Sequence, residues 1–224
     1  MRIFSQIEAV CHETGRVSSE ITVVGVTKFV DVPQIQEAIE AGLKHIGESK
    51  VQEARKKFPG LGNSDIKVTR HMIGHLQTNK VKSALEVFDC IQSVDSLKLA
   101  VAIEEQAAKR NRSIDILIQV NTTGEQQKFG IAPSGVFAFI EQVIGLKHVR
   151  LQGLMTVAPL VEDKEVVRKC FRDLRLLRDG IVNKFSGDDR VVMTYLSMGM
   201  TGDYAIALEE GANMVRIGRA IFQN

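Results

Sequence analysis

The chain has 224 residues, of which 44% are hydrophobic and 25% are charged, and its formal net charge is +2. This length fits one large domain or two small ones, and the apolar content is sufficient for a full core. The small net charge and the interspersed charged residues disfavour a dedicated nucleic-acid binder, for which a strongly basic face is expected. No apolar stretch reaches the roughly 18 residues that a transmembrane helix needs, so we expect no membrane span.

The cysteines and the first residues of the chain indicate the compartment. Cys11, Cys90 and Cys170 are odd in number, far apart in the sequence and form no C-x-x-C pair. This pattern is typical of a reducing environment. Residues 1–15 lack the long apolar run of a signal peptide. We therefore expect a cytoplasmic protein with no nucleic-acid or membrane partner.

The first two predicted elements lead to a lysine. Apolar residues at helical spacing predict a helix over residues 3–14. Residues 21–28 are rich in Val, Ile and Thr and end in Lys28, which is typical of a strand buried on both faces. Such a lysine can simply reach solvent or pair with a carboxylate. It would also lie at the carboxyl end of a strand, where α/β barrels carry their chemistry.

Seven further strands and seven further helices are predicted downstream. The strands cover residues 45–48, 68–73, 90–94, 115–121, 149–157, 191–196 and 213–217. The helices lie at residues 31–42, between residues 48 and 60, and at about 78–87, 96–108, 136–143, 163–181 and 204–210. No helix is predicted after the eighth strand, so the first helix is expected to cover that side.

The alternation of eight strands with helices predicts the fold class. Alternating elements favour a parallel sheet, and eight strands favour closure into an α/β, (β/α)8 TIM barrel over an open doubly wound sheet. We find no repeat, linker or shift in composition, so residues 1–224 are predicted to form a single domain. One helix face carries Lys169, Arg172, Arg175 and Arg178; we interpret it as a solvated face and assign it no partner.

In a barrel, the carboxyl ends of all strands meet at one mouth. Two of the segments expected there, residues 196–202 and 215–219, suit a phosphate group. The first has hydroxyls, small residues and exposed N–H groups at the start of a helix, and the second has Gly218, which allows close approach to the backbone. The loops after strands seven and eight form the common phosphate site of α/β barrels. Each loop alone also fits an ordinary Ser/Gly-rich loop.

A lysine at one strand end and a phosphate cradle at two others match the needs of pyridoxal 5′-phosphate (PLP). This cofactor requires an amine for a Schiff base, a phosphate anchor and a partner for its pyridine nitrogen. Arg216 is the candidate partner. An arginine stays protonated, so it can donate to the nitrogen but hardly protonates it. The pyridine would then be a weaker electron sink than one paired with a carboxylate.

Several motifs resemble the pyridoxal-phosphate homeostasis protein family. They are residues 26–28, 47–48, 71–80, Asn121 with 124–125 and 128–130, 153–155, 196–201 and 215–222. The resemblance covers nearly the whole chain, and its most specific blocks are residues 71–80 and 196–222. It implies a single barrel like the N-terminal domain of bacterial alanine racemase, which carries PLP as an aldimine on Lys28.

The resemblance also implies the other residues of the site. Around the phosphate it places Ser197, Gly199, Thr201, Gly218 and Arg219, and it places Arg216 near the pyridine nitrogen. Ser49, His75, Asn121 and Met155 are the remaining expected cofactor contacts. Members of this family are thought to buffer and deliver PLP, and no catalytic activity is established for them. We therefore expect a non-enzymatic monomer whose transient partners are PLP-dependent apoenzymes.

Two positions depart from the family pattern. Ser49 replaces the usual asparagine, so a contact to the cofactor ring is expected to be lost or mediated by water. Arg70 stands where the family tends to have tryptophan, which should alter only the rim.

Competing interpretations use some of the same residues. His71 and His75 invite a metal site, but the segment is predicted as a strand running into a loop and has no evident third ligand, so we expect no metal. Lys80 and Lys128 end no buried strand, which leaves Lys28 as the better Schiff-base candidate.

An amino-acid racemase-like enzyme is the main alternative function. It requires a second base opposite Lys28, which in the racemase is a tyrosine of the partner subunit's second domain. The tyrosines here, Tyr195 and Tyr204, are predicted inside a strand and on a helix, and the chain is expected to have no room for a second domain. A barrel enzyme that acts on a phosphorylated sugar through Lys28 is a third hypothesis, and it predicts no bound chromophore.

Overall fold

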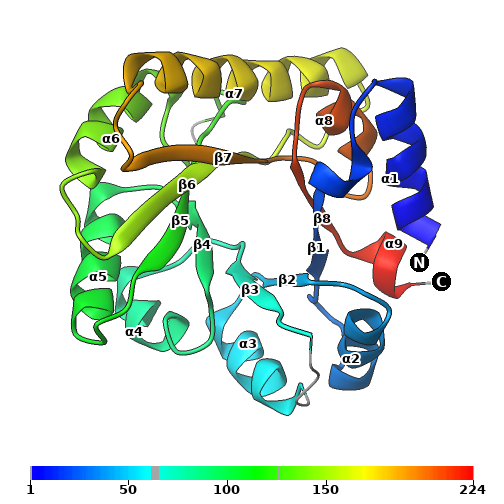
Figure 1. The fold of residues 1–224 in the computed structure, drawn as a ribbon, viewed down its shortest axis with the longest axis horizontal. Coiled ribbons are helices and arrows are strands. Elements are labelled where there is room, and N and C mark those ends of the chain that lie inside the picture. The colour runs from blue at the N-terminus through cyan, green and yellow to red at the C-terminus, as the bar shows by residue number, and fades with distance from the viewer. Residues whose placement is uncertain (1, 62–65, 126, 224) are drawn as a thin grey trace.

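The computed structural model describes residues 2–61, 66–125 and 127–223 and shows a closed barrel of eight parallel strands (Figure 1). The strands follow one another around the barrel in chain order, and β8 pairs with β1 to close it. They are β1 (Thr22–Val26), β2 (His45–Glu48), β3 (Thr69–Met72), β4 (Cys90–Val94), β5 (Ile114–Gln119), β6 (Val149–Met155), β7 (Val191–Ser197) and β8 (Met214–Ile217). The predicted TIM barrel is confirmed, whereas a single domain over residues 1–224 stays a prediction.

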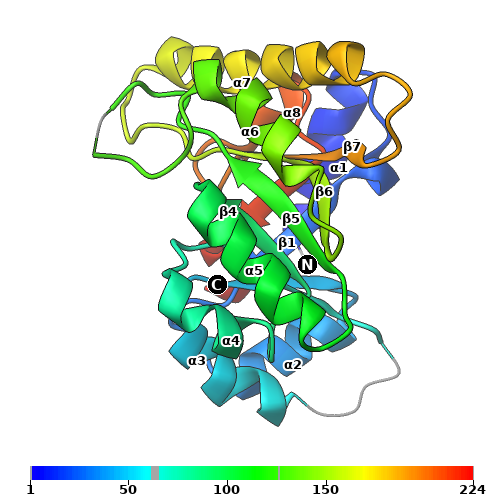
Figure 2. The ribbon, with the colours of Figure 1, turned by 90° about the vertical axis from the view of Figure 1, so that its left-hand side faces the viewer.

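Helices surround the barrel, and short 3-10 turns join some of them to the strands. The α-helices are α1 (Arg2–Glu13), α2 (Val32–Glu40), α3 (Val51–Lys57), α4 (Val81–Ala84), α5 (Leu97–Ala108), α6 (Val136–Val143), α7 (Lys164–Lys184), α8 (Tyr204–Glu209) and α9 (Arg219–Phe222). The 3-10 turns are η1 (Ser18–Glu20), η2 (Phe58–Gly60), η3 (Thr78–Lys80) and η4 (Pro133–Gly135). In the side view of Figure 2, α6, α7 and α8 lie at one end of the molecule and α2, α3 and α4 at the other. No helix in the described parts of the chain is long and apolar enough to cross a membrane.

The helix α9 corrects the prediction that no helix follows the eighth strand. It begins immediately after Gly218 and is only four residues long, too short for a periodic apolar pattern to reveal it. The first helix nevertheless contacts both α8 and α9, so it covers this side as expected. The helix predicted at residues 78–87 is also shorter, because the chain forms η3 and a four-residue α4 before Phe88 enters the core.

The basic face of α7 is only partly solvated. Arg172 and Arg175 reach across to Glu210 at the end of α8, with N–O distances of 3.0 and 3.4 Å, and Arg168 joins them at 3.3 Å. Glu210 is buried, which raises its pKa, but hydrogen bonds from the arginines outweigh burial and hold the pKa below its usual value. These arginines therefore attach α7 to α8.

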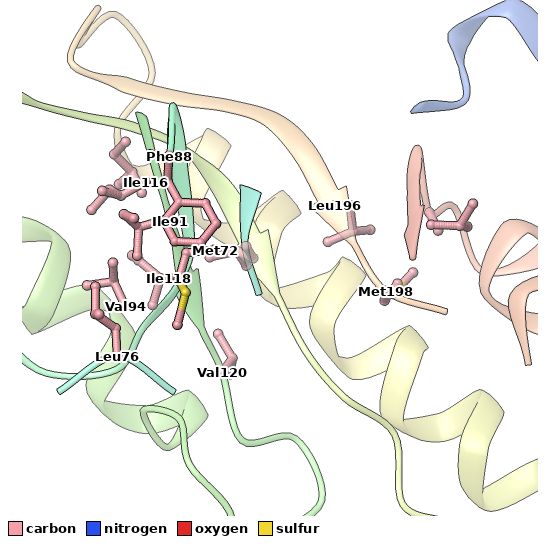
Figure 3. Packing of buried hydrophobic residues seen from close by; sticks show 14 of the residues in the cluster. Met72, Leu76, Phe88, Ile91, Val94, Ile116, Ile118, Val120, Leu196 and Met198 are labelled. Atoms are coloured by element: carbon pink, nitrogen blue, oxygen red, sulfur yellow. The ribbon is translucent and has the colours of Figure 1, made fainter. Parts of the chain in front are cut away.

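The core has two parts. The larger part lies between the strands and the helices, and Figure 3 shows a portion of it with Met72, Phe88, Ile91 and Leu196. A small apolar cluster fills part of the barrel interior with Val24, Cys90, Leu117, Met155, Met214 and the half-buried Tyr195. Buried polar side chains on the inward side of the strands share this interior.

Gly153 marks a tight approach between β6 and β7. Its φ is +152°, and a Cβ placed there would lie 1.9 Å from the Tyr195 carbonyl oxygen. The register between the two strands also shifts between Leu151 and Gly153. Only glycine permits this contact without moving the backbone of β7.

We expect Gly153→Ala to lower the free energy of unfolding by about 3 kcal/mol or more, because the new methyl group must displace a strand. Gly145→Ala is the matched control, since a Cβ there lies 3.6 Å from its nearest neighbour, the Gln142 carbonyl oxygen. Urea denaturation of both variants checks this expectation. Equal stability of the two variants would contradict it.

Candidate functional site

A cavity of about 570 Å³ opens at the carboxyl ends of β1, β7 and β8. Five of the residues predicted from the sequence line it together: Lys28, Thr201, Arg216, Gly218 and Arg219. Apolar side chains complete the wall, among them Phe29, Leu160 and Met200. The structure thus gathers an amine, a hydroxyl, two guanidinium groups and a glycine around one opening.

Lys28 lies two residues beyond the end of β1 and is exposed. Its Nζ lies 4.9 Å from the centroid of the Phe29 ring, and among the described residues no carboxylate lies within ion-pair distance of it. The expected placement after a buried strand is therefore observed, and the amine reaches solvent. The side chain is thus accessible to a ligand that enters the cavity.

A buried carboxylate holds the backbone that precedes Lys28. Glu48, at the end of β2, accepts hydrogen bonds from the Thr27 hydroxyl at 3.1 Å and from the Lys57 ammonium at 3.1 Å. Lys57 also donates to the Thr27 carbonyl oxygen at 2.9 Å, and the Thr27 N–H donates to the Gly47 carbonyl at 2.9 Å. These bonds fix the peptide that leads into Lys28.

Sequence reasoning assigned no role to Lys57. The sequence did contain an indication of such a partner, because a carboxylate such as Glu48 at the end of a buried strand needs a cation or several donors.

The loop from β7 to α8 has the form of an anion cradle. Gly199 has φ +93°, and a Cβ there would lie 2.6 Å from the Ala207 Cβ, so the turn requires glycine. The Arg216 N–H donates to the Gly199 carbonyl at 2.9 Å, which ties the loop to β8. In the described parts of the chain, the backbone N–H groups of Thr201 and Gly202 have no acceptor. Unpaired backbone donors beside a helix start are the groups that bind phosphate.

Arg216 forms part of the cavity wall but is only 4% exposed. One terminal nitrogen donates to Ser197 Oγ and the other donates to the Thr156 carbonyl oxygen, both at 2.7 Å. Burial lowers the pKa of Arg216 to about 10, although the nearby Asp203 opposes this shift. The side chain is therefore a fixed cation at neutral pH, with further N–H donors beyond the two that are used.

The other predicted residues lie around or behind this cavity. Ser197 is buried beneath Arg216, and Met155 belongs to the interior apolar cluster. Ser49 and His75 line a separate hollow of about 250 Å³. Asn121 lines a third hollow and binds its own loop, since its Nδ2 donates to the Glu125 carbonyl at 2.8 Å. The structure therefore does not bring all eleven predicted residues into one cavity.

His75 connects two loops at the mouth. Its Nδ1 lies 3.0 Å from Asp95 Oδ2, and its ring stacks on Phe129 with 3.9 Å between the centroids. His71, in contrast, points into the barrel and is buried. In the described parts of the chain, no group of three His, Cys, Asp or Glu side chains is arranged to hold a metal ion.

His71 belongs to a polar cluster that sequence reasoning did not identify. Its Nδ1 lies 3.0 Å from Gln92 Nε2, and its Nε2 lies 3.0 Å from His45 Nδ1. Gln92 Oε1 in turn accepts a hydrogen bond from Ser197 Oγ at 2.7 Å. Burial, with a smaller contribution from His45, lowers the pKa of His71 to about 3.

Comparison with known proteins places this barrel in a class. The family model for the N-terminal domain of alanine racemase matches residues 8–223. The alanine racemase structure from Clostridium difficile 630 has a TM-score of 0.76 at 14% identity, and the alignment covers 99% of this chain and 56% of that one. The chain is thus a barrel of the alanine-racemase N-terminal type, and the racemase structure itself shows the fold alone.

More similar relatives define the family. Pyridoxal phosphate homeostasis proteins of Aquifex aeolicus and Vibrio cholerae are 39% and 36% identical, with alignments that cover 99% and 98% of this chain and 94% and 92% of theirs. The PLP-bound structure of PipY from Synechococcus elongatus PCC7942 is 32% identical with a TM-score of 0.83. The alignment covers 96% of this chain and 99% of that one. The chain belongs to the pyridoxal phosphate homeostasis protein family, which confirms the resemblance seen in the sequence.

The low pKa of His71 predicts a pH dependence of stability. Below its ordinary pKa of 6.5, His71 is protonated in the unfolded state. In the folded state it stays neutral until the pH falls to about 3. The free energy of unfolding should therefore fall as the pH drops from 6.5 towards 3, by about 2 kcal/mol between pH 7 and pH 5 from this group. Chemical denaturation at pH 7 and at pH 5 measures the loss of unfolding free energy between them. This loss should be smaller by about 2 kcal/mol in His71→Gln than in the wild type. Equal losses in the two proteins would contradict the assignment.

Proposed function

We propose that this chain binds PLP in the 570 Å³ cavity and holds it as a Schiff base with Lys28. The observation that carries the proposal is the meeting of an unpaired amine, an anion cradle and a fixed guanidinium around one opening. The PLP-bound structure of PipY, a relative of nearly the same length, supports it. When bound, the cofactor would supply an aldehyde for the amine and a pyridine ring that withdraws electrons.

The residues present fit such a ligand. The unpaired N–H groups of Thr201 and Gly202, together with the Thr201 hydroxyl, would hold the phosphate, and Gly199 permits the turn that precedes them. Arg219 would add positive charge at the rim, and Gly218 would allow close approach. Arg216 would donate to the pyridine nitrogen with a guanidinium that Ser197 and Thr156 hold in place. Contacts from Ser49, His75, Asn121 and Met155 stay predictions from the family resemblance.

We further propose that the protein stores and releases the cofactor and does not act as an enzyme. Racemisation requires a second base on the opposite face of the substrate from the lysine. Tyr195 packs against the apolar cluster inside the barrel, where burial raises its pKa. Among the described residues that line the cavity there is no tyrosine or histidine.

The exposure of Lys28 also suits reversible loading. A cofactor on an exposed amine is accessible to water, to small amines and to a PLP-dependent apoenzyme that approaches the mouth. The protein would meet such apoenzymes transiently, as a monomer.

Lys28→Ala should abolish covalent loading. Purified wild-type protein incubated with PLP should be yellow, and borohydride should convert the chromophore into a stable adduct that mass mapping places on Lys28. Lys128→Ala is the matched control, because Lys128 is paired with Glu125 at 2.6 Å and lies outside the cavity. A colourless wild-type protein that takes up no PLP, or an adduct on another lysine, would overturn the proposal. Rapid alanine racemisation by the loaded wild type would overturn the non-enzymatic role.

A further inference from the structure

A continuous series of buried polar side chains crosses the barrel interior from the cavity to the beginning of β2. Starting at the cavity, it runs through Arg216, Ser197, Gln92, His71 and His45. Successive donor–acceptor distances are 2.7, 2.7, 3.0 and 3.0 Å. Ser197 and Gln92 are fully buried, His71 is 2% exposed, and only His45 is half-buried. We call this series the interior chain.

The chemistry at its first member sets the direction of every bond. A guanidinium has only donors, so Ser197 Oγ must accept from Arg216. The single hydroxyl proton of Ser197 then turns towards Gln92 Oε1, which leaves the Gln92 amide nitrogen to donate to His71 Nδ1. His71 therefore carries its proton on Nε2 and donates to His45 Nδ1, and His45 in turn carries its proton on Nε2.

Every hydrogen bond along the interior chain has one donor and one acceptor in this arrangement. The second amide proton of Gln92 is directed at the sulfur of Met214, at 3.2 Å. Burial is the largest cause that lowers the pKa of both histidines, which keeps the two rings neutral at pH 7, as the single direction requires. Reversing the direction would make Ser197 and Arg216 two opposed donors, which is costly in a buried site.

The partners of Arg216 are also all neutral. Its terminal nitrogens meet a hydroxyl and a carbonyl oxygen, and in the described parts of the chain no carboxylate lies within ion-pair distance of it. The guanidinium is thus held in place without a carboxylate in direct contact, although the nearby Asp203 acts on its charge. Its charge remains available to a ligand in the cavity.

We propose that Gln92 and His71 are positioning residues that hold Arg216 as an oriented donor, and that Arg216 in turn fixes the tautomers of His71 and His45. The part of this proposal that concerns the cofactor rests on the proposed function, with Arg216 facing the pyridine nitrogen. The part that concerns the tautomers holds for the protein alone. Gln92, which belongs to none of the sequence motifs, is the central member of the interior chain.

The first test uses the protein without cofactor. Nitrogen-15 NMR of labelled histidines in the wild type should show both His71 and His45 protonated at Nε2. In Gln92→Glu, a carboxylate replaces the amide and accepts from both sides, so His71 should acquire a proton at Nδ1. A wild-type His71 protonated at Nδ1, or an unchanged His71 in Gln92→Glu, would overturn the proposed direction.

The second test measures PLP binding. Gln92→Met keeps the length of the side chain but cannot accept from Ser197 through oxygen or donate to His71, so Arg216 loses its orientation. We expect PLP to bind about tenfold more weakly, with a shifted absorption maximum of the bound cofactor. Ser93→Ala is the matched control. The Ser93 hydroxyl, next to Gln92 on β4, is buried, lies outside the interior chain and has no hydrogen-bond partner among the residues that the structure describes. It should leave affinity, spectrum and histidine tautomers unchanged.

The outcomes separate the two proposals. If the wild type binds no PLP, the proposed function fails, while the NMR experiment still decides the direction of the interior chain. If the wild type binds PLP and Gln92→Met binds it with unchanged affinity and spectrum, the positioning role of Gln92 is overturned and the proposed function stands. If Gln92→Met does not fold, Gln92→Glu and the wild-type tautomers decide.

Discussion

The burial of the Arg216 guanidinium at the end of β8 is the constraint on which the site depends. A buried cation is tolerated only when its donors are satisfied, and here the acceptors come from β7 and from the segment that follows β6. Closure of the barrel brings these elements to one side of β8. The same closure ties the Gly199 turn to the Arg216 backbone, so that the anion cradle and the cation are parts of one rigid unit.

The entrance of the cavity is organised differently from its wall. Arg216 is held by buried neutral groups. Lys28 is exposed to solvent, and hydrogen bonds of Thr27 with Glu48 and Lys57 fix the peptide that precedes it. A fixed backbone with a free amine restricts where the nitrogen can go and leaves its reactivity to the ligand. This combination suits a cofactor that must be captured reversibly, because capture needs a positioned amine and release needs access.

Much of the fold was predictable because the barrel repeats one local pattern. Each buried strand is a short apolar run between helical segments. Because the carboxyl ends of barrel strands meet at one mouth, the sequence alone predicted that Lys28 and Arg216 lie there. The interior chain could not be found this way, because Ser197 and Gln92 lie 105 residues apart and meet only through barrel closure. The sequence left open whether Lys28 reaches solvent or pairs with a carboxylate, and the structure, through the turn that follows β1, shows it exposed.

The neutrality of the groups behind Arg216 bears on the proposed role in cofactor storage. A carboxylate beside a pyridine nitrogen favours its protonation and makes the ring a strong electron sink, whereas a guanidinium can only donate to the unprotonated nitrogen. In our proposal the interior chain orients this guanidinium, and a pyridine ring bound against it would stay neutral. A cofactor held in this state would form its covalent link to an amine but would activate an attached substrate weakly, which agrees with the proposed carrier role.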